Sequence, residues 1–229
     1  LAEMGGKNAI LIDSDADLDE AIRGVAESAF AYAGQKCSAC SRVLVPRSLQ
    51  DSFVERLVEV AKSRKIGPAE DPGCVVSPVI DNEARDRIHA MVDRAVQAGA
   101  KIAYAGQVDP SLATQGSYVA PHILTQVDPT SEIAQQEVFG PVLVVLTYDS
   151  LDQAFNLANS TRFALTGGIY SRSPSTLDRA RREILDQHVA LLDQFVEHAL
   201  ALRMLGVDRD RALIVVEHGE VERVRTLHI

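Results

Sequence analysis

Three short stretches of the sequence hold the residue types that could carry out covalent chemistry. They are Glu3-Met4-Gly5-Gly6-Lys7-Asn8, Gly34-Gln35-Lys36-Cys37 and Glu137-Val138-Phe139-Gly140-Pro141. Cys37 offers a thiol, which is a strong nucleophile once it is deprotonated, and Glu3 offers a carboxylate that could act as a general base. Taken singly, each stretch is ordinary, because a lone cysteine is most often a small buried hydrophobic residue and a Gly-Gly pair is usually a turn.

A thiol at this position would need activation to act as a nucleophile. A free cysteine has a pKa near ~8.5, so only a few per cent of it is thiolate at pH 7, and a nearby base or a local field must shift that balance. Glu3 is far from Cys37 in the sequence, so only the fold could bring the two together. A carboxylate at the usual pKa of about 4.3 is a weak base, and partial burial would have to raise that pKa. Gly5, beside Glu3, would let the backbone approach a cofactor closely.

The elements around Cys37 predict an open, well-supported loop. Residues 9–12 are apolar and predict a buried strand, and Asp17 is a suitable cap for a helix that follows and ends at Gly34. Residues 42–45 predict the next strand. Cys37 should therefore lie in a loop between a helix end and a strand, where small neighbours such as Ser38 leave a thiol accessible.

The remaining pattern alternates strands with helices. We expect helices at 49–64, 81–98, 130–136, 151–159 and 175–183, and strands at 101–104, 118–124, 142–148 and 167–171. The segment 142–148 is almost wholly apolar, which is typical of a central strand. This alternation predicts an α/β fold with a largely parallel sheet and flanking helices.

Composition narrows the possible partners and location. The net charge of −9 argues against nucleic acid binding, and no apolar run reaches the roughly 20 residues of a membrane helix. Three cysteines (Cys37, Cys40, Cys74) are too few for a disulfide scaffold, so we expect a reducing, cytoplasmic location. Cys37 and Cys40 form a Cys-x-x-Cys pair, but no second ligand pair accompanies it, so we predict no metal site and assign Cys40 to the core.

Together the three stretches resemble the aldehyde dehydrogenase superfamily, because they occur in the order and at the spacing of that family's glutamate, cysteine and Glu-x-Phe-Gly-Pro motifs. The resemblance implies that Cys37 attacks an aldehyde carbon to give a thiohemiacetal, that hydride passes to NAD or NADP, and that Glu3 activates the water that hydrolyses the thioester. It also implies that Glu137 holds the nicotinamide-side ribose hydroxyls and that Phe139 packs near the nicotinamide. A homo-oligomeric parent enzyme is expected on the same ground.

Longer strings are similar to the 1-pyrroline-5-carboxylate (glutamate-semialdehyde) dehydrogenase branch of that superfamily. These strings are Ala2–Ala9, Asp13–Asp19, Gln35–Arg42, Ala164–Gly168 and Ser171–Pro174. The similarity implies L-glutamate γ-semialdehyde as the substrate and a role for Ser38 in binding its carboxylate.

The resemblance runs from residue 1 to about Glu183, so we expect a truncated catalytic domain at 1–183 and a separate tail at 184–229. The chain starts inside the glutamate motif and lacks the family's dinucleotide-binding domain, which predicts a segment of a longer protein. The tail predicts a helix followed by a hairpin between 211–217 and 221–228. The alternative to an enzyme is an inactive α/β remnant that only binds or oligomerises.

Overall fold

The protein is described here by a computed structural model that places residues 5–185. The elements follow one another along the chain in a largely alternating order. They are β1 (Asn8–Ile12), α1 (Leu18–Phe30), β2 (Cys40–Pro46), α2 (Gln50–Lys62), α3 (Asn82–Gln97), β3 (Lys101–Ala105), α4 (Pro110–Ala113), β4 (His122–Thr125), α5 (Glu132–Gln135), β5 (Val142–Tyr148), α6 (Leu151–Ala158), β6 (Gly167–Tyr170) and α7 (Pro174–Ala180), with short helical turns at Ala31–Gly34, Arg47–Leu49 and Arg181–Leu185.

A single six-stranded sheet organises the described part of the chain, in the order β3-β4-β5-β2-β1-β6. All neighbouring strands are parallel except β3 and β4, which confirms the predicted largely parallel α/β fold. Strands β1, β2 and β5 are buried along almost their whole length, as expected of parallel strands covered on both faces.

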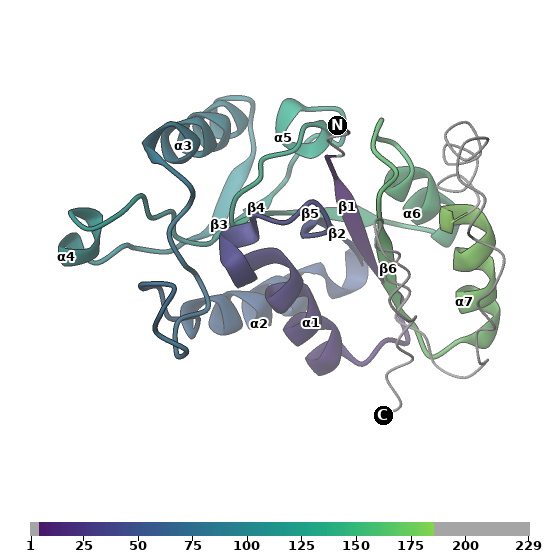
Figure 1. Cartoon of the computed structure of the whole chain (residues 1–229). Coiled ribbons are helices and arrows are strands. Elements are labelled where there is room, and N and C mark those ends of the chain that lie inside the picture. Colours follow the sequence, from purple (N-terminus) through teal and green to yellow (C-terminus); the bar gives the residue numbers. More distant parts are fainter. Residues whose placement is uncertain (1–4, 186–229) are drawn as a thin grey trace, which may run out of the picture.

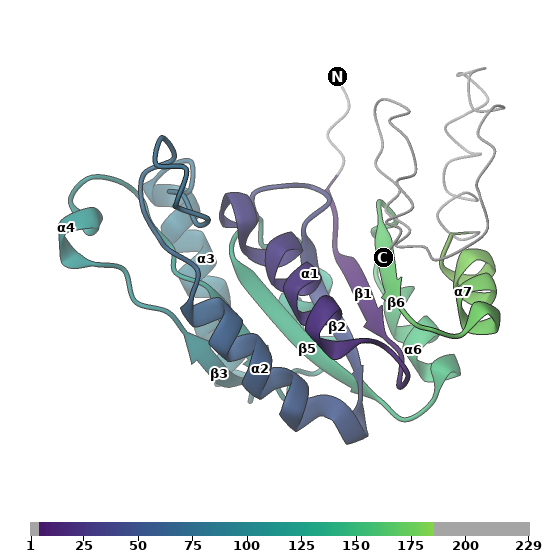
Figure 2. The ribbon, with the colours of Figure 1, turned by 90° about the horizontal axis from the view of Figure 1, so that it is seen from below.

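Helices cover both faces of the sheet. Figure 1 shows α1 and α2 on one face, and α3, α5 and α6 on the other side. Figure 2 shows α1 and α2 lying across β2 and β5, with α7 beyond the β6 edge. Phe30 and Phe53 from the first pair of helices and Phe155 from α6 are fully or almost fully buried, so the hydrophobic core continues on both faces of the sheet.

The predicted helix starts are confirmed. Asp17 accepts hydrogen bonds from the backbone N–H groups of Asp19 and Glu20, and Asp81 caps α3 in the same way through Ala84 N–H. Gly99, just beyond α3, has φ +103°, a backbone conformation that glycine adopts at little cost.

Two predicted boundaries are wrong. The helix before the thiol ends at Phe30 rather than at Gly34, because Tyr32 and Ala33 take left-handed φ values of 61° and 53°, which cannot continue a right-handed helix. The strand predicted from residue 118 begins only at His122, because Pro121 has no N–H for the ladder. The predicted tail helix and hairpin lie outside the described residues.

Candidate active site

The described parts of all three motifs lie at one edge of the sheet. Lys7 immediately precedes β1, the cysteine loop precedes β2, and Pro141 precedes β5. These three strands are parallel neighbours in the order β5-β2-β1, so their amino ends meet at the same edge. The fold therefore gathers segments that are up to 131 positions apart in the sequence, the separation between Gly6 and Glu137.

The Cys37 side of this edge is a short turn with an exposed thiol. Cys37 is an exposed free cysteine, and Ser38 beside it is half-buried. The turn is tied to the fold on one side by Gln35, which accepts a hydrogen bond from Ile80 N–H at 2.9 Å and donates to the Pro78 carbonyl at 3.3 Å. An exposed thiol on an anchored turn is accessible to a ligand and keeps a fixed position.

Asn8 anchors the backbone of the turn that carries the Cys37 thiol. Its side-chain amide donates to the Cys37 carbonyl at 2.7 Å and to the Ala39 carbonyl at 2.9 Å. Asn8 is almost fully buried, so these carbonyls are satisfied by protein rather than by water. One side chain at the start of β1 thus fixes the backbone carbonyl of Cys37.

Two glycines allow the motifs to touch. A Cβ at Gly6 would lie 2.0 Å from the Cys37 carbonyl oxygen, and a Cβ at Gly34 would lie 2.3 Å from the Gly140 carbonyl oxygen. Gly34 also has φ +65°, which disfavours other residues. At both positions the backbone of another motif comes so close that only glycine fits. Each of these contacts therefore joins two different motifs.

Glu137, from the third motif, contacts the Gly5-Gly6 pair. Its Oε1 accepts a hydrogen bond from Gly6 N–H at 2.9 Å, and its Oε2 would lie 2.6 Å from a Cβ at Gly5. The carboxylate is half-buried beside the glycine pair, and this position suits a carboxylate that accepts from hydroxyl groups of a ligand.

Phe139 lies on the exposed side of the same loop. It has φ 52° and remains 39% exposed, whereas Val138 and Gly140 on either side are buried. The Val138 carbonyl accepts a hydrogen bond from the Arg87 guanidinium at 2.8 Å, which fixes the backbone at this strained position. An aromatic ring presented in this way is available to pack against a planar group.

Two buried bases support the motifs, and the sequence pattern alone did not single them out. Arg42 donates to the backbone carbonyls of Lys7, Leu157 and Ala158 at 2.8 to 3.0 Å, so it joins β1 to the end of α6. Lys7 is 2% exposed, and burial lowers its pKa to about 7, with the nearby Arg42 charge acting in the same direction. The available signal for Lys7 and Arg42 was a charged residue type next to or within a buried strand. For Asn8 it was a polar amide at the start of such a strand.

Two further site predictions concern Glu3 and Cys40. Glu3, the predicted general base, lies outside the described residues, so its role stays a prediction. Cys40 is buried, and burial raises the pKa of its thiol to about 12, which agrees with its assignment to the core. Within residues 5–185, no group of three or more His, Cys, Asp or Glu side chains could hold a metal ion, and no helix there is long and apolar enough to span a membrane.

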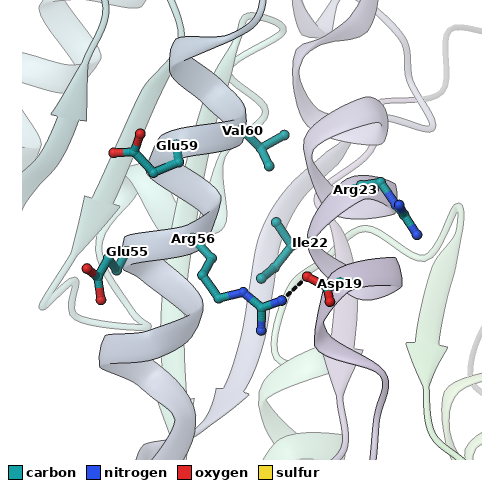
Figure 3. Close-up of a pocket in the computed structure, with 7 residues that line it drawn as sticks. All are labelled: Asp19, Ile22, Arg23, Glu55, Arg56, Glu59 and Val60. Atoms are coloured by element: carbon teal, nitrogen blue, oxygen red, sulfur yellow. Dashed lines mark hydrogen bonds and ion pairs between the residues drawn. The ribbon is translucent and has the colours of Figure 1, made fainter.

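A groove on the described surface lies away from these motifs, between α1 and α2 (Figure 3). It has a volume of about 520 Å³, with Ile22 and Val60 among charged side chains and an ion pair between Arg56 and Asp19. None of the three motifs contributes a residue to it. The candidate active site is therefore the amino edge of β1, β2 and β5, and not this groove.

An α/β sheet with an exposed cysteine at this edge defines a candidate thiol site, and comparisons identify the family. Residues 1–199 match the profile of the Aldehyde dehydrogenase family, and the chain belongs to that family. Among curated proteins, the 1-pyrroline-5-carboxylate dehydrogenase of Geobacillus sp. (strain WCH70) is 37% identical over 183 residues, which are 80% of this chain and 35% of that protein. The chain thus spans about a third of the length of such relatives.

Solved structures share the fold. The proline utilization A protein (PutA) from Bdellovibrio bacteriovorus, inactivated by N-propargylglycine, matches with a TM-score of 0.75 and 49% identity over 80% of this chain and 18% of that chain. The betaine aldehyde dehydrogenase from Staphylococcus aureus in complex with NAD+ matches with a TM-score of 0.77 and 34% identity over 80% of this chain and 36% of that chain.

Proposed function

We propose that the chain is the thiol-bearing segment of an enzyme that oxidises L-glutamate γ-semialdehyde to L-glutamate, with NAD or NADP as hydride acceptor. The observation that carries this proposal is the joining of the motifs at one sheet edge. Gly6 lies against the Cys37 carbonyl and donates to Glu137, while Gly34 lies against Gly140. The similarity to 1-pyrroline-5-carboxylate dehydrogenases supports the choice of substrate.

In this proposal the thiol does the covalent work. Cys37 Sγ, as thiolate, attacks the aldehyde carbon, and the carbonyl oxygen becomes the oxyanion of a thiohemiacetal. When bound, NAD or NADP would accept that carbon's hydrogen as a hydride, with both electrons of the C–H bond, and the acyl group would remain on Cys37 as a thioester. Glu3 then takes a proton from a water molecule that attacks the thioester, releasing the carboxylic acid and the Cys37 thiolate.

The residues around Cys37 fit the cofactor and substrate roles that the family implies. Glu137 offers its half-buried carboxylate to the two ribose hydroxyls, and Phe139 offers an exposed ring beside it. Gly5 leaves room for a close backbone approach, since it has no side chain of its own. Ser38, next to the nucleophile, would donate its hydroxyl to the substrate carboxylate.

The test is steady-state turnover of L-glutamate γ-semialdehyde, followed by NAD reduction, with the protein encoded by the complete open reading frame. We expect Cys37→Ala to lower kcat by at least about a thousandfold, the usual effect of losing a nucleophile. Cys40→Ala is the matched control, because that thiol is buried, and it should retain most of the rate. Full activity of Cys37→Ala would refute the assignment of the nucleophile.

The substrate assignment has its own test. Ser38→Ala should raise KM for L-glutamate γ-semialdehyde by about ten- to a hundredfold and leave KM for butanal, which has no carboxylate, within about twofold. Equal effects on both aldehydes would refute the Ser38 role. No turnover of any aldehyde by the complete protein would favour the alternative, an inactive binding module. A homo-oligomeric state and a cytoplasmic location remain predictions.

A further inference from the structure

A fourth segment reaches the candidate site, and it belongs to none of the three motifs. It is the loop 159–166, which joins α6 to β6. Strand β6 lies beside β1 and runs parallel to it, so this loop enters the sheet at the same amino edge as the Gly5-Gly6 pair. Two of its side chains, Arg162 and Phe163, contact the segments around Glu137 and Gly5.

The Phe163 ring lies against Gly5 on the side that also faces Glu137. A Cβ at Gly5 would lie 3.1 Å from Phe163 Cε1 and 2.6 Å from Glu137 Oε2. Because both distances start from one point, the ring edge and the carboxylate are neighbours on the same side of Gly5. The ring therefore occupies space beside Oε2, while Oε1 accepts the hydrogen bond from Gly6 N–H at 2.9 Å.

Arg162 ties the same loop to the residue directly before Glu137. Its Nη2 donates to Gln136 Oε1 at 3.0 Å, across 26 positions of sequence. Its guanidinium also lies 5.0 Å from the centroid of the Phe163 ring, within the range of a cation–π interaction. One guanidinium thus contacts both the ring and the segment that carries the carboxylate.

The loop is itself anchored. At its start, Arg42 donates to the carbonyls of Leu157 and Ala158 at 2.8 Å, which fixes the end of α6. Within the loop, the Thr161 hydroxyl donates to the Phe163 carbonyl at 3.1 Å. A ring on a loop that is held in this way can restrict the side chain beside it.

We propose that Arg162 and Phe163 are positioning residues that hold the Glu137 carboxylate on the Gly6 N–H, in the orientation that accepts the two cofactor ribose hydroxyls. The inference rests on the proposed function, because it takes the ribose role of Glu137 from there. Arg162 and Phe163 act through Glu137 and touch neither the aldehyde nor Cys37. Their loss should therefore weaken cofactor binding and leave aldehyde binding almost unchanged.

The first test needs neither cofactor nor activity. Hydrogen exchange of the Gly6 amide, followed by NMR on the 229-residue chain, should be at least about threefold faster in Arg162→Leu and in Phe163→Leu than in the wild type. The reason is that Glu137 is then less firmly held on that N–H. Glu137→Ala sets the upper limit of this acceleration. Unchanged Gly6 exchange in either variant would overturn the role of the residue that was replaced.

Two matched controls and one core amide separate positioning from a general loss of stability. Arg47→Leu removes an arginine from an exposed ion pair at the opposite edge of the sheet, and Tyr104→Leu removes a half-buried ring from the edge strand β3. Both should leave Gly6 exchange within about twofold of the wild type. In Arg162→Leu and Phe163→Leu, the buried Leu44 amide of β2 should keep its exchange rate. Equal acceleration at Gly6 and Leu44 would mean global destabilisation and would overturn the proposal.

The second test is kinetic and uses the protein encoded by the complete open reading frame. Arg162→Leu should raise KM for NAD at least about threefold and leave KM for L-glutamate γ-semialdehyde within about twofold. Arg162 is exposed, so this variant should fold. Equal changes in the two KM values would overturn the proposal, as would an unchanged KM for NAD.

A double variant separates this inference from the proposed function. If Arg162 acts through Glu137, Arg162→Leu should add little to KM for NAD once Glu137→Gln is present. If the effects of the two changes multiply, Arg162 acts elsewhere and the inference fails. If Glu137→Gln alone leaves KM for NAD unchanged while Arg162→Leu still speeds Gly6 exchange, the ribose role of Glu137 is wrong and the positioning of its carboxylate by the loop stands.

Discussion

Replacing Gly6 by alanine should displace the backbone of Cys37, the proposed nucleophile, without changing its side chain. The new Cβ would lie 2.0 Å from the Cys37 carbonyl oxygen, and Cβ contacts below 3.0 Å are essentially never observed. The carbonyl must therefore move by about 1 Å. It is held in its present position by the Asn8 amide at 2.7 Å, which this movement would strain.

The expected cost has two parts. Crowding in a packed site destabilises a fold by about 1–3 kcal/mol, which should appear in the urea-induced unfolding of the chain. A displacement of about 1 Å at a nucleophile can lower kcat/KM by about a hundredfold in the complete protein. Gly73→Ala is the control, because the nearest atom to a Cβ at Gly73 is a movable Asp71 carboxylate oxygen at 3.2 Å. If Gly6→Ala matched Gly73→Ala in both stability and kcat/KM, the Cys37 carbonyl would not lie against Gly6.

Three further predictions concern Asn8, Cys37 and Lys7, which lie at the same edge of the sheet. Asn8→Ala should lower the free energy of unfolding by about 1–3 kcal/mol, because it leaves two carbonyls without their donor, whereas Asn156→Ala on the exposed side of α6 should have little effect. Iodoacetamide followed by peptide mapping should label Cys37 before Cys40, because Cys40 is buried and its pKa is raised to about 12; equal labelling rates would contradict this. Burial lowers the pKa of Lys7 from 10.5 to about 7, so between these pH values the unfolded chain binds a proton that the folded chain does not, and the stability of the wild type rises with pH. Below pH 7, Lys7→Met should therefore be more stable than the wild type by up to about 5 kcal/mol. Urea unfolding at pH 6 and pH 10 should show this difference in stability becoming smaller at the higher pH.

Much of the fold was predictable because it depends on local signals. The apolar run of β5 predicted a central strand, and that strand lies between β4 and β2. The caps at Asp17 and Asp81 require only a side-chain oxygen near the free N–H groups of the first helical turn, so they could be recognised in the sequence.

The contacts within the site could not be predicted in the same way. Gly6 touches Cys37 only because β1 and β2 are neighbours, and Gly34 touches Gly140 only because β5 lies on the other side of the cysteine loop. Strand order is a property of the whole sheet, and local patterns do not contain it. The left-handed turn at Tyr32 was missed for another reason, since tyrosine rarely adopts φ 61° and only the surrounding fold imposes it.

The arrangement at the amino edge has a consequence for catalysis. Ligands of open parallel sheets usually bind at the carboxyl ends of the strands, where the turns into helices meet. Here the proposed chemistry lies at the opposite edge, where the Gly5-Gly6 segment enters β1 between two loops. Gly6 lies against the Cys37 carbonyl and donates its N–H to Glu137, so one residue contacts both the proposed nucleophile and the proposed cofactor ligand. Because packed backbone atoms move together, a change that shifts Glu137 should also shift the thiol turn, and a change on the thiol side should be felt at Glu137.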